Sequence, residues 1–198
     1  MKKPILAIAL AAMILFGASF GLNGIAAKNA QDTHLRLLQT VLPDAKEFTL
    51  EPYSGEDANI RSVHKSDIGF VVEASTYGYA GNITMLIGVN NAGKVTGLVV
   101  TEAHETWGLG SKALTDHVFL AQFLNKSGTF AVATHGDEAD AFSSATGEDT
   151  AAADGESIEV DALTGATVTT KAVIRCVNSA VAYVTGADTS SSATSWGG

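Results

Sequence analysis

The sequence predicts an α+β fold in which one domain built on antiparallel strands follows a single apolar N-terminal segment. Three observations support this prediction. Residues 5–27 contain no charged side chain. Short runs rich in β-branched residues occur between positions 69 and 101. Apolar residues recur at three- and four-residue steps in two later stretches. The chain has 198 residues, enough for a membrane anchor and one domain of ordinary size.

The N-terminal segment predicts one membrane-spanning helix. A span needs about 20 apolar residues, and residues 5–27 supply them behind Lys2 and Lys3. Basic flanks stay on the cytoplasmic side, so we expect residues 1–4 in the cytoplasm and the rest outside, at the inner (cytoplasmic) membrane. A cleaved signal peptide is the alternative. Its apolar region is only about 7–15 residues long, and Lys28 makes the following segment a poor cleavage site.

Residues 28–67 are predicted to connect this anchor to the domain. Leucines and valines at helical spacing indicate a helix from Lys28 to Ala45, with Pro43 ending the periodic run. The stretch from Phe48 to Ser66 is polar and contains proline, glycine and paired acids, which is typical of a loop.

The domain itself is predicted to span residues 68–186. Strands are expected at 69–75, 83–89 and 95–101, and the Asn-Asn-Ala-Gly sequence at 90–93 is a tight-turn signal, so the three should form an antiparallel meander. A helix is expected from Ala113 to Leu124, a strand at 157–161, and a second helix from Val168 that ends at Gly186. Residues 136–156 read as an acidic flexible insertion and residues 187–198 as a disordered tail.

Charge and cysteine content exclude several classes of function. The formal net charge is −9, which repels phosphate backbones and argues against nucleic-acid binding. Cys176 is the single cysteine, so neither an internal disulfide nor a cysteine-ligated metal centre can form. The histidines lack metal-ligand spacing. No metal site and no catalytic residue are predicted, and any redox chemistry must use an organic cofactor.

A threonine-rich turn, Asp161-Ala162-Leu163-Thr164-Gly165-Ala166-Thr167-Val168-Thr169-Thr170, joins the last strand to the last helix. Backbone N–H groups at a helix start are unpaired and attract phosphate. Gly165 permits close approach to a ligand, and the threonine hydroxyls can bond to phosphate oxygens or be esterified. The alternative is structural, since threonine is also a favoured helix N-cap.

This turn resembles the D-x-x-[ST]-G-A-T-x-[ST] signature of the FMN-binding domain family, which includes the G subunit of the Rnf electron-transport complex and the C subunit of the sodium-translocating NADH:quinone oxidoreductase. The resemblance implies a phosphoester between FMN and Thr167, installed from FAD by a flavin transferase of the ApbE type. Thr164 stands where the family usually has serine. The implied cofactor-binding residues of the turn are Thr164, Gly165, Ala166, Thr167, Val168 and Thr169.

A second block, from Thr101 to Gly110, resembles the family's H-x-E-T-P-G-L-G-type loop, with His104 directly before Glu105 and Trp107 in place of proline. The resemblance implies that this loop lies against the flavin ring. The implied contacts are His104, Glu105, Thr106, Leu109 and Gly110.

The length and single anchor are more similar to the Rnf protein of this family. The implied function is that of a membrane-anchored electron relay with covalent FMN, a redox subunit without complete activity alone. It would work with integral membrane and other subunits of an Rnf-type ferredoxin:NAD⁺ oxidoreductase coupled to Na⁺ or H⁺ translocation. Two alternatives stay open: an extracytoplasmic flavin subunit of another respiratory reductase, and a cofactor-free tethered structural domain in which Thr167 only caps a helix.

Overall fold

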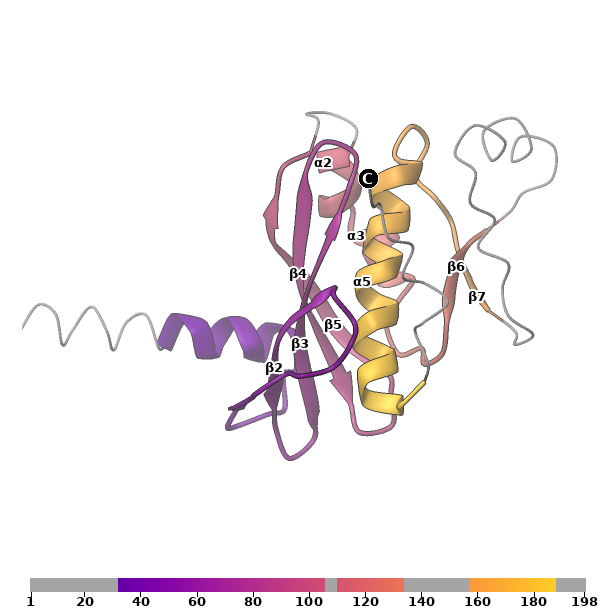
Figure 1. Ribbon diagram of the computed structural model, residues 1–198. Coiled ribbons are helices and arrows are strands. Elements are labelled where there is room, and N and C mark those ends of the chain that lie inside the picture. The colour runs from indigo at the N-terminus through magenta and orange to yellow at the C-terminus, as the bar shows by residue number, and fades with distance from the viewer. Residues whose placement is uncertain (1–31, 106–109, 134–156, 188–198) are drawn as a thin grey trace, which may run out of the picture. The chain divides into compact units, whose positions relative to one another are not determined.

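The computed structural model describes residues 32–105, 110–133 and 157–187 (Figure 1). The expected span at 5–27, the insertion at 136–156 and positions 188–198 of the expected tail lie outside this part of the chain. Within the described ranges, no helix combines the length and the apolarity that a membrane crossing requires. The chain divides after Leu37 into two units. A helix covers residues 32–41, and the second unit, from Leu38 onward, is the domain.

A five-stranded antiparallel sheet in the order β1-β2-β3-β4-β5 forms the centre of the domain. Its strands are β1 (Thr49–Glu51), β2 (Ile60–Lys65), β3 (Gly69–Tyr77), β4 (Asn82–Asn90) and β5 (Val95–Ala103). The predicted meander is confirmed, because β3 pairs with β4 from Gly69 opposite Asn90 to Tyr77 opposite Asn82, and β4 pairs with β5. Gly93 closes the predicted turn at φ +75°.

The interpretation of Phe48–Ser66 as loop is wrong at β1 and β2, which extend the sheet. In β2 only Ile60 and Val63 are buried apolar residues, and the pairing with β3 shifts between Ile60 and Ser62. This irregularity breaks the two-residue alternation by which a half-buried strand is recognised. β1 has just three residues and a mostly exposed pattern at the sheet edge. Neither strand therefore carries a strong pattern of its own.

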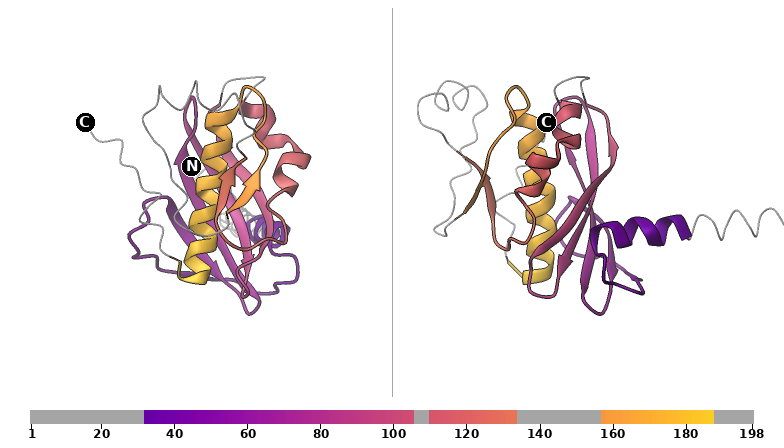
Figure 2. Two further views of the ribbon diagram at one scale, coloured as in Figure 1. Left: turned by 90° about the vertical axis from the view of Figure 1, so that its right-hand side faces the viewer. Right: turned by 180° about the vertical axis from the view of Figure 1, so that it is seen from behind.

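The long helix α5 (Thr167–Thr185) lies between the sheet and a separate pair of strands, β6 (Phe130–Val132) and β7 (Ile158–Val160) (Figures 1 and 2). β6 and β7 pair in parallel, so the final strand expected at 157–161 is present but has a partner that the sequence did not indicate. Small and β-branched side chains of α5 are fully buried in the core together with residues of β3 and β4. Gly186 ends α5 in the left-handed conformation, as predicted.

The opposite face of the sheet is covered locally by the chain around Val41. Leu38, Val41 and Leu42 are buried, and the Thr96 hydroxyl donates to the Val41 carbonyl at 2.6 Å. A Cβ at either Gly88 or Gly97 would meet the Val41 backbone. Apolar side chains are thus buried on both faces in the middle of the sheet.

The helix expected over 113–124 is two short helices, α2 (Gly110–Thr115) and α3 (His117–Ala121). Asp116 separates them. Its backbone is extended, with φ −78° and ψ 108°, and its carboxylate accepts from the N–H groups of Val118 and Phe119. Asp at this position favours a new helix start over continuation. The predicted apolar face is confirmed at Leu114, Phe119 and Phe123, which are buried, but not at Val118, which was expected on the same face and is 80% exposed.

Phe123 joins the short helices to the core. Its side chain is fully buried and its ring lies 5.6 Å from that of Phe119 and 5.2 Å from that of Phe130. We expect Phe123→Ala to lower the free energy of unfolding by about 3–5 kcal/mol, because the truncation leaves a cavity. Denaturant unfolding measures this. Val118, 80% exposed in α3, is the matched control, and Val118→Ala should change stability by less than about 0.5 kcal/mol. Equal effects of the two substitutions would contradict this packing.

The contact between α5 and β3 includes the one thiol. The Thr76 hydroxyl donates to the Ala172 carbonyl at 3.1 Å and lies 3.5 Å from the Cys176 sulfur. Burial raises the pKa of Cys176 from 9.0 to about 11, and the Thr76 hydrogen bond opposes this rise only in part.

This raised pKa makes stability fall with rising pH between about 9 and 11, because the unfolded thiol ionises first. The contribution should be fully present below pH 9. Between pH 8 and pH 10 wild-type protein should lose about 1 kcal/mol more unfolding free energy than Cys176→Ala. Other groups titrate in this window, so the difference between the two proteins, measured by denaturant unfolding at both pH values, is the quantity to test. Identical pH dependence would refute the assignment.

Candidate functional site

The threonine-rich turn leads directly into the first turn of α5. Gly165 adopts φ +77°, a conformation that side-chain-bearing residues rarely take. Ala166 is the N-cap and makes no side-chain capping bond, and its N–H donates to the Leu163 carbonyl. The first helical bond runs from the Thr170 N–H to the Ala166 carbonyl. The N–H groups of residues 167–169 precede it and so have no acceptor within the helix.

The four threonines of this turn differ sharply in accessibility. Thr164 and Thr167 are exposed, whereas Thr169 is 1% exposed and Thr170 is fully buried. Among the described residues, Thr164 and Thr167 are therefore the threonines of this turn that an enzyme or a bulky cofactor can approach. Thr167 is the first residue of α5 and does not cap it, so the structural interpretation of its hydroxyl as an N-cap is wrong.

Glu105, just after β5, ties this helix start to a distant turn. Its Oε2 accepts from the Thr169 hydroxyl at 2.9 Å. Its Oε1 accepts from the N–H of Tyr79 at 2.8 Å and, more weakly, from that of Ala80 at 3.4 Å. Tyr79 and Ala80 form the tip of the turn between β3 and β4. One half-buried carboxylate therefore connects β5, the β3–β4 turn and α5.

Two glycines leave room for the Glu105 carboxylate. A Cβ on Gly78 or on Gly110 would collide with one of its oxygens, and on Gly110 it would also meet the Thr169 hydroxyl at 2.8 Å. Gly110 is the first residue of α2, so the start of this helix also packs against Glu105. In Figures 1 and 2 the β3–β4 turn, α2 and the start of α5 occupy the same end of the domain.

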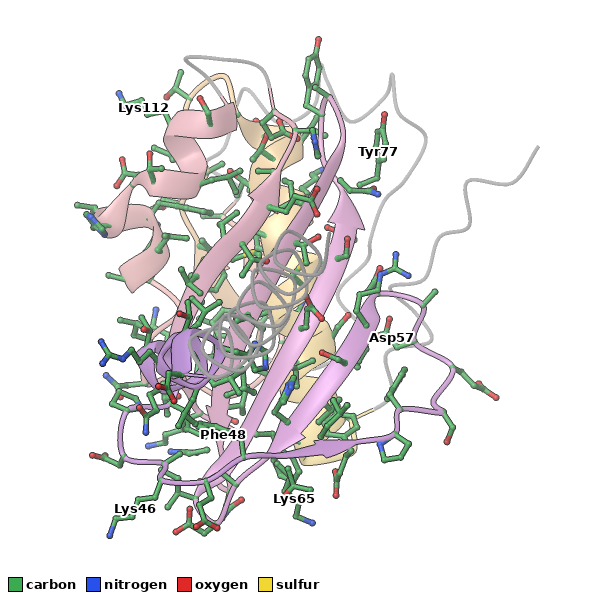
Figure 3. The ribbon with its side chains drawn as sticks, turned by 90° about the vertical axis from the view of Figure 1, so that its left-hand side faces the viewer. Lys46, Phe48, Asp57, Lys65, Tyr77 and Lys112 are labelled. Atoms are coloured by element: carbon green, nitrogen blue, oxygen red, sulfur yellow. The ribbon has the colours of Figure 1, made fainter. Side chains whose placement is uncertain are left out.

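His104 lies apart from this network, although it precedes Glu105 in the chain. Its Nδ1 is 3.9 Å from Glu102 Oε1 and its side chain is well exposed. With Arg61, Ser75 and Tyr77 it lines an open depression of about 670 Å³. Figure 3 shows Tyr77 at the end of β3 and Lys112 on α2 at the same end of the domain.

The structure thus brings together part of the predicted set. Glu105, Gly110 and Thr169 make one contact cluster, and Thr164 to Val168 form the turn beside it. His104 faces the depression instead, and Thr106 and Leu109 lie outside the described residues. Tyr79 and Ala80 were not predicted as site residues. The Tyr-Gly-Tyr-Ala-Gly sequence at 77–81 links two predicted strands and is in keeping with the family, but it does not single out Tyr79 and Ala80, since their contribution comes from backbone N–H groups that any residue type can supply.

In the described part of the chain, no three His, Cys, Asp or Glu side chains gather closely enough to hold a metal ion. The chemistry available at the start of α5 is that of N–H donors, hydroxyls and one carboxylate.

Residues 78–182 match the sequence profile of the FMN-binding domain. This range begins at the glycine that adjoins Glu105 and ends within α5, so it contains the whole cluster. The chain belongs to the FMN-binding domain family.

Within this family the chain is similar to G subunits of ion-translocating complexes. It is 34% identical over 115 residues to the G subunit of the Na⁺-translocating ferredoxin:NAD⁺ oxidoreductase complex of Acetobacterium woodii, covering 58% of this chain and 48% of that protein. It is 35% identical over 118 residues to the G subunit of the proton-translocating ferredoxin:NAD⁺ oxidoreductase complex of Clostridium ljungdahlii, and this match covers 60% of this chain and 54% of that protein. The G subunit of the ion-translocating oxidoreductase complex of Methanosarcina acetivorans is 30% identical over 159 residues, and this match covers 74% of this chain and 72% of that protein. The chain spans about half the length of the first two relatives.

Among solved structures, the C subunit of the Na⁺-translocating NADH-quinone reductase from Parabacteroides distasonis aligns with a TM-score of 0.46 at 20% identity, covering 71% of this chain and 76% of that one.

The residues present fit the phosphate end of an FMN group. Three successive N–H groups without helical acceptors favour an anion at the start of α5. The positive φ of Gly165 turns the chain there without a side chain in the way. Thr167 presents an exposed hydroxyl at the first helical position. The absence of a side-chain cap on a helix of 19 residues leaves this anion position open.

The Glu105–Thr169 bond should contribute to stability. Thr169→Val keeps the shape of a nearly buried side chain but removes the hydroxyl, leaving Glu105 Oε2 without this donor. We expect a loss of about 1–2 kcal/mol in unfolding free energy, since hydrogen bonds to charged groups are stronger than neutral ones. Thr167→Val, two residues away and exposed, is the control and should cost less than about 0.5 kcal/mol. A Thr169→Val protein as stable as wild type would show that the bond contributes nothing.

Proposed function

We propose that this chain carries FMN covalently on Thr167 and serves as an electron-carrying component of an Rnf-type ion-translocating oxidoreductase complex. The observation that supports the attachment site is the accessibility of the threonines. Thr167 is exposed at an uncapped helix start, while Thr169 and Thr170 are buried. Family membership supports FMN as the cofactor, and the similar G subunits support the type of complex.

The attachment is a phosphoryl transfer that balances without a redox step. The Thr167 hydroxyl oxygen forms a bond to the FMN-side phosphorus of FAD, the pyrophosphate bond breaks, and AMP leaves. The hydroxyl proton passes to a base of an ApbE-type flavin transferase. This chain supplies the nucleophile, and the N–H groups of residues 167–169 stabilise negative charge on the transferred phosphate.

Each part of the cluster then has a task in holding the group. The start of α5 holds the phosphate by N–H donation, and Glu105 keeps the first turn of α5 in place by accepting from Thr169. Bound FMN would supply electron transfer in steps of one or two electrons. A covalent link also retains the cofactor where free FMN would diffuse away.

The sequence features and the relatives together support a proposed cellular setting. Residues 5–27 would anchor the chain in the inner membrane and hold the domain on the extracytoplasmic side, beside integral membrane subunits. Electrons would pass between ferredoxin and NAD⁺ through the assembly, coupled to Na⁺ or H⁺ translocation.

Co-expression with an ApbE-type flavin transferase tests the attachment. The full-length protein should give a fluorescent band on a denaturing gel under ultraviolet light, and its intact mass should increase by one FMN residue. Thr167→Ala should abolish both signals without loss of folding, because the attacking oxygen is gone. Thr164→Ala is the matched control, since this threonine is also exposed and lies in the same turn; it should keep the link. Flavin retained by Thr167→Ala would move the site, and a wild-type protein without flavin would favour a cofactor-free domain.

A further inference from the structure

Tyr77 and Tyr79 carry unusually exposed aromatic rings beside this site. Their exposed fractions are 64% and 68%, although large aromatic side chains normally bury most of their surface. Both lie at the end of the β3–β4 hairpin. They differ in their surroundings, and this difference suggests a ligand contact for one of them.

The Tyr79 backbone is held firmly. The Gly78 N–H donates to the Gly81 carbonyl at 2.8 Å and closes the turn. Glu105 Oε1 then accepts from the next two N–H groups, those of Tyr79 and Ala80. Gly78 is buried and could not carry a Cβ, because the Glu105 carboxylate and Ile83 fill that space. The backbone from which the Tyr79 ring extends is therefore fixed before any partner arrives, so the ring can sample only the positions that its own two side-chain torsions allow.

The same carboxylate fixes the distance between this turn and the start of α5. One hydrogen bond of 2.8 Å joins Tyr79 to Glu105, and one of 2.9 Å joins Glu105 to Thr169. Thr169 and Thr167 belong to the same helical turn. The backbone N–H of Tyr79 is therefore separated from the helical turn that bears Thr167 by a single carboxyl group and two hydrogen bonds.

Tyr77 has a different environment. It lines the open depression with Arg61, Ser75 and His104, whereas Tyr79 does not. The Tyr77 carbonyl accepts from Arg175, not from a group in the Glu105 network. The two tyrosines therefore form a natural pair of test and control residues with nearly equal exposure.

We propose that Glu105 is a positioning residue that holds the β3–β4 turn against the first turn of α5, and that the Tyr79 ring so placed forms one wall of the flavin compartment, in contact with the isoalloxazine ring. The proposal rests on attachment of FMN at Thr167. The isoalloxazine is a flat aromatic system joined to its phosphate by a short ribityl chain, so it must settle close to the start of α5. An exposed phenol ring held at that place offers it an offset-stacked or edge-to-face partner.

Flavin fluorescence tests the contact, because a phenol ring touching an isoalloxazine quenches its emission by donating an electron to the excited state. The measurement uses full-length flavinylated protein in a Trp107→Phe background, since an indole two residues from Glu105 in the sequence could quench as well. Fluorescence is normalised to the visible absorbance of the flavin. Tyr79→Leu should raise the quantum yield severalfold, and Tyr77→Leu should leave it unchanged.

Substitutions of Glu105 test the positioning role. Glu105→Gln can keep the geometry, because its amide oxygen can accept from Tyr79 while its NH₂ group donates to the Thr169 hydroxyl. Glu105→Ala removes every one of these bonds. We expect Glu105→Ala to raise the quantum yield as Tyr79→Leu does, and Glu105→Gln to keep it near the wild-type value.

Hydrogen exchange of the Tyr79 and Ala80 amides in unflavinylated Thr167→Ala protein gives a readout without cofactor. Protection there should be lost on adding Glu105→Ala and kept on adding Glu105→Gln.

The outcomes separate this proposal from the proposed function. Wild-type protein that acquires no flavin would refute attachment at Thr167, and the hydrogen-exchange comparison would still test Glu105. Flavinylated Tyr79→Leu with unchanged quantum yield would refute the ring contact. An increase in flavin quantum yield seen in Tyr77→Leu but not in Tyr79→Leu would place the isoalloxazine in the depression that Tyr77 lines. Unchanged amide protection in Glu105→Ala would refute the positioning role.

Discussion

The site depends on one carboxylate that accepts hydrogen bonds from two distant segments at once. Glu105 joins the β3–β4 turn to the first turn of α5 and leaves space for no side chain at Gly78 or Gly110. A carboxylate has enough lone pairs for several donors, and charge-assisted bonds of this kind are stronger than neutral ones. Without it, the Thr169 hydroxyl and the turn N–H groups would need other partners.

The N-termini of two helices, α3 and α5, differ in capping and therefore in local stability. The short α3 begins at Asp116, which caps it with two bonds, whereas the 19-residue α5 begins at Ala166 with no side-chain cap. An alanine in place of a capping side chain costs about 1 kcal/mol. Burial along α5 between the sheet and the β6–β7 pair offsets this cost. The uncapped end keeps its N–H groups available for an anion, and a capping side chain would occupy that place.

Elements with a strong local sequence pattern were predicted correctly, whereas elements with a weak pattern were missed. β3, β4 and β5 are rich in β-branched and other apolar residues, a clear turn joins β4 to β5, and the end of α5 is marked by Gly186. β2 lacks regular alternation, and β6 finds its parallel partner 28 positions along the chain, since Phe130 pairs with Ile158. The signature turn singled out Thr167 and its neighbours as candidate residues. The Glu105–Thr169 bond joins residues 64 positions apart, and no periodicity or spacing reports such a contact.

His104 and Glu105 are adjacent in the sequence but lie in different environments, and the alternation of side chains along an extended backbone explains this. β5 ends at Ala103, and consecutive residues of an extended chain point to opposite sides. Glu105 accordingly turns toward α5 and His104 toward the open depression, where a Cβ on Gly81 would meet the Cβ of His104 at 2.7 Å. The β3–β4 turn touches both, through Tyr79 on one side and Gly81 on the other. The β3–β4 turn is therefore the physical link between the Glu105 side and the depression.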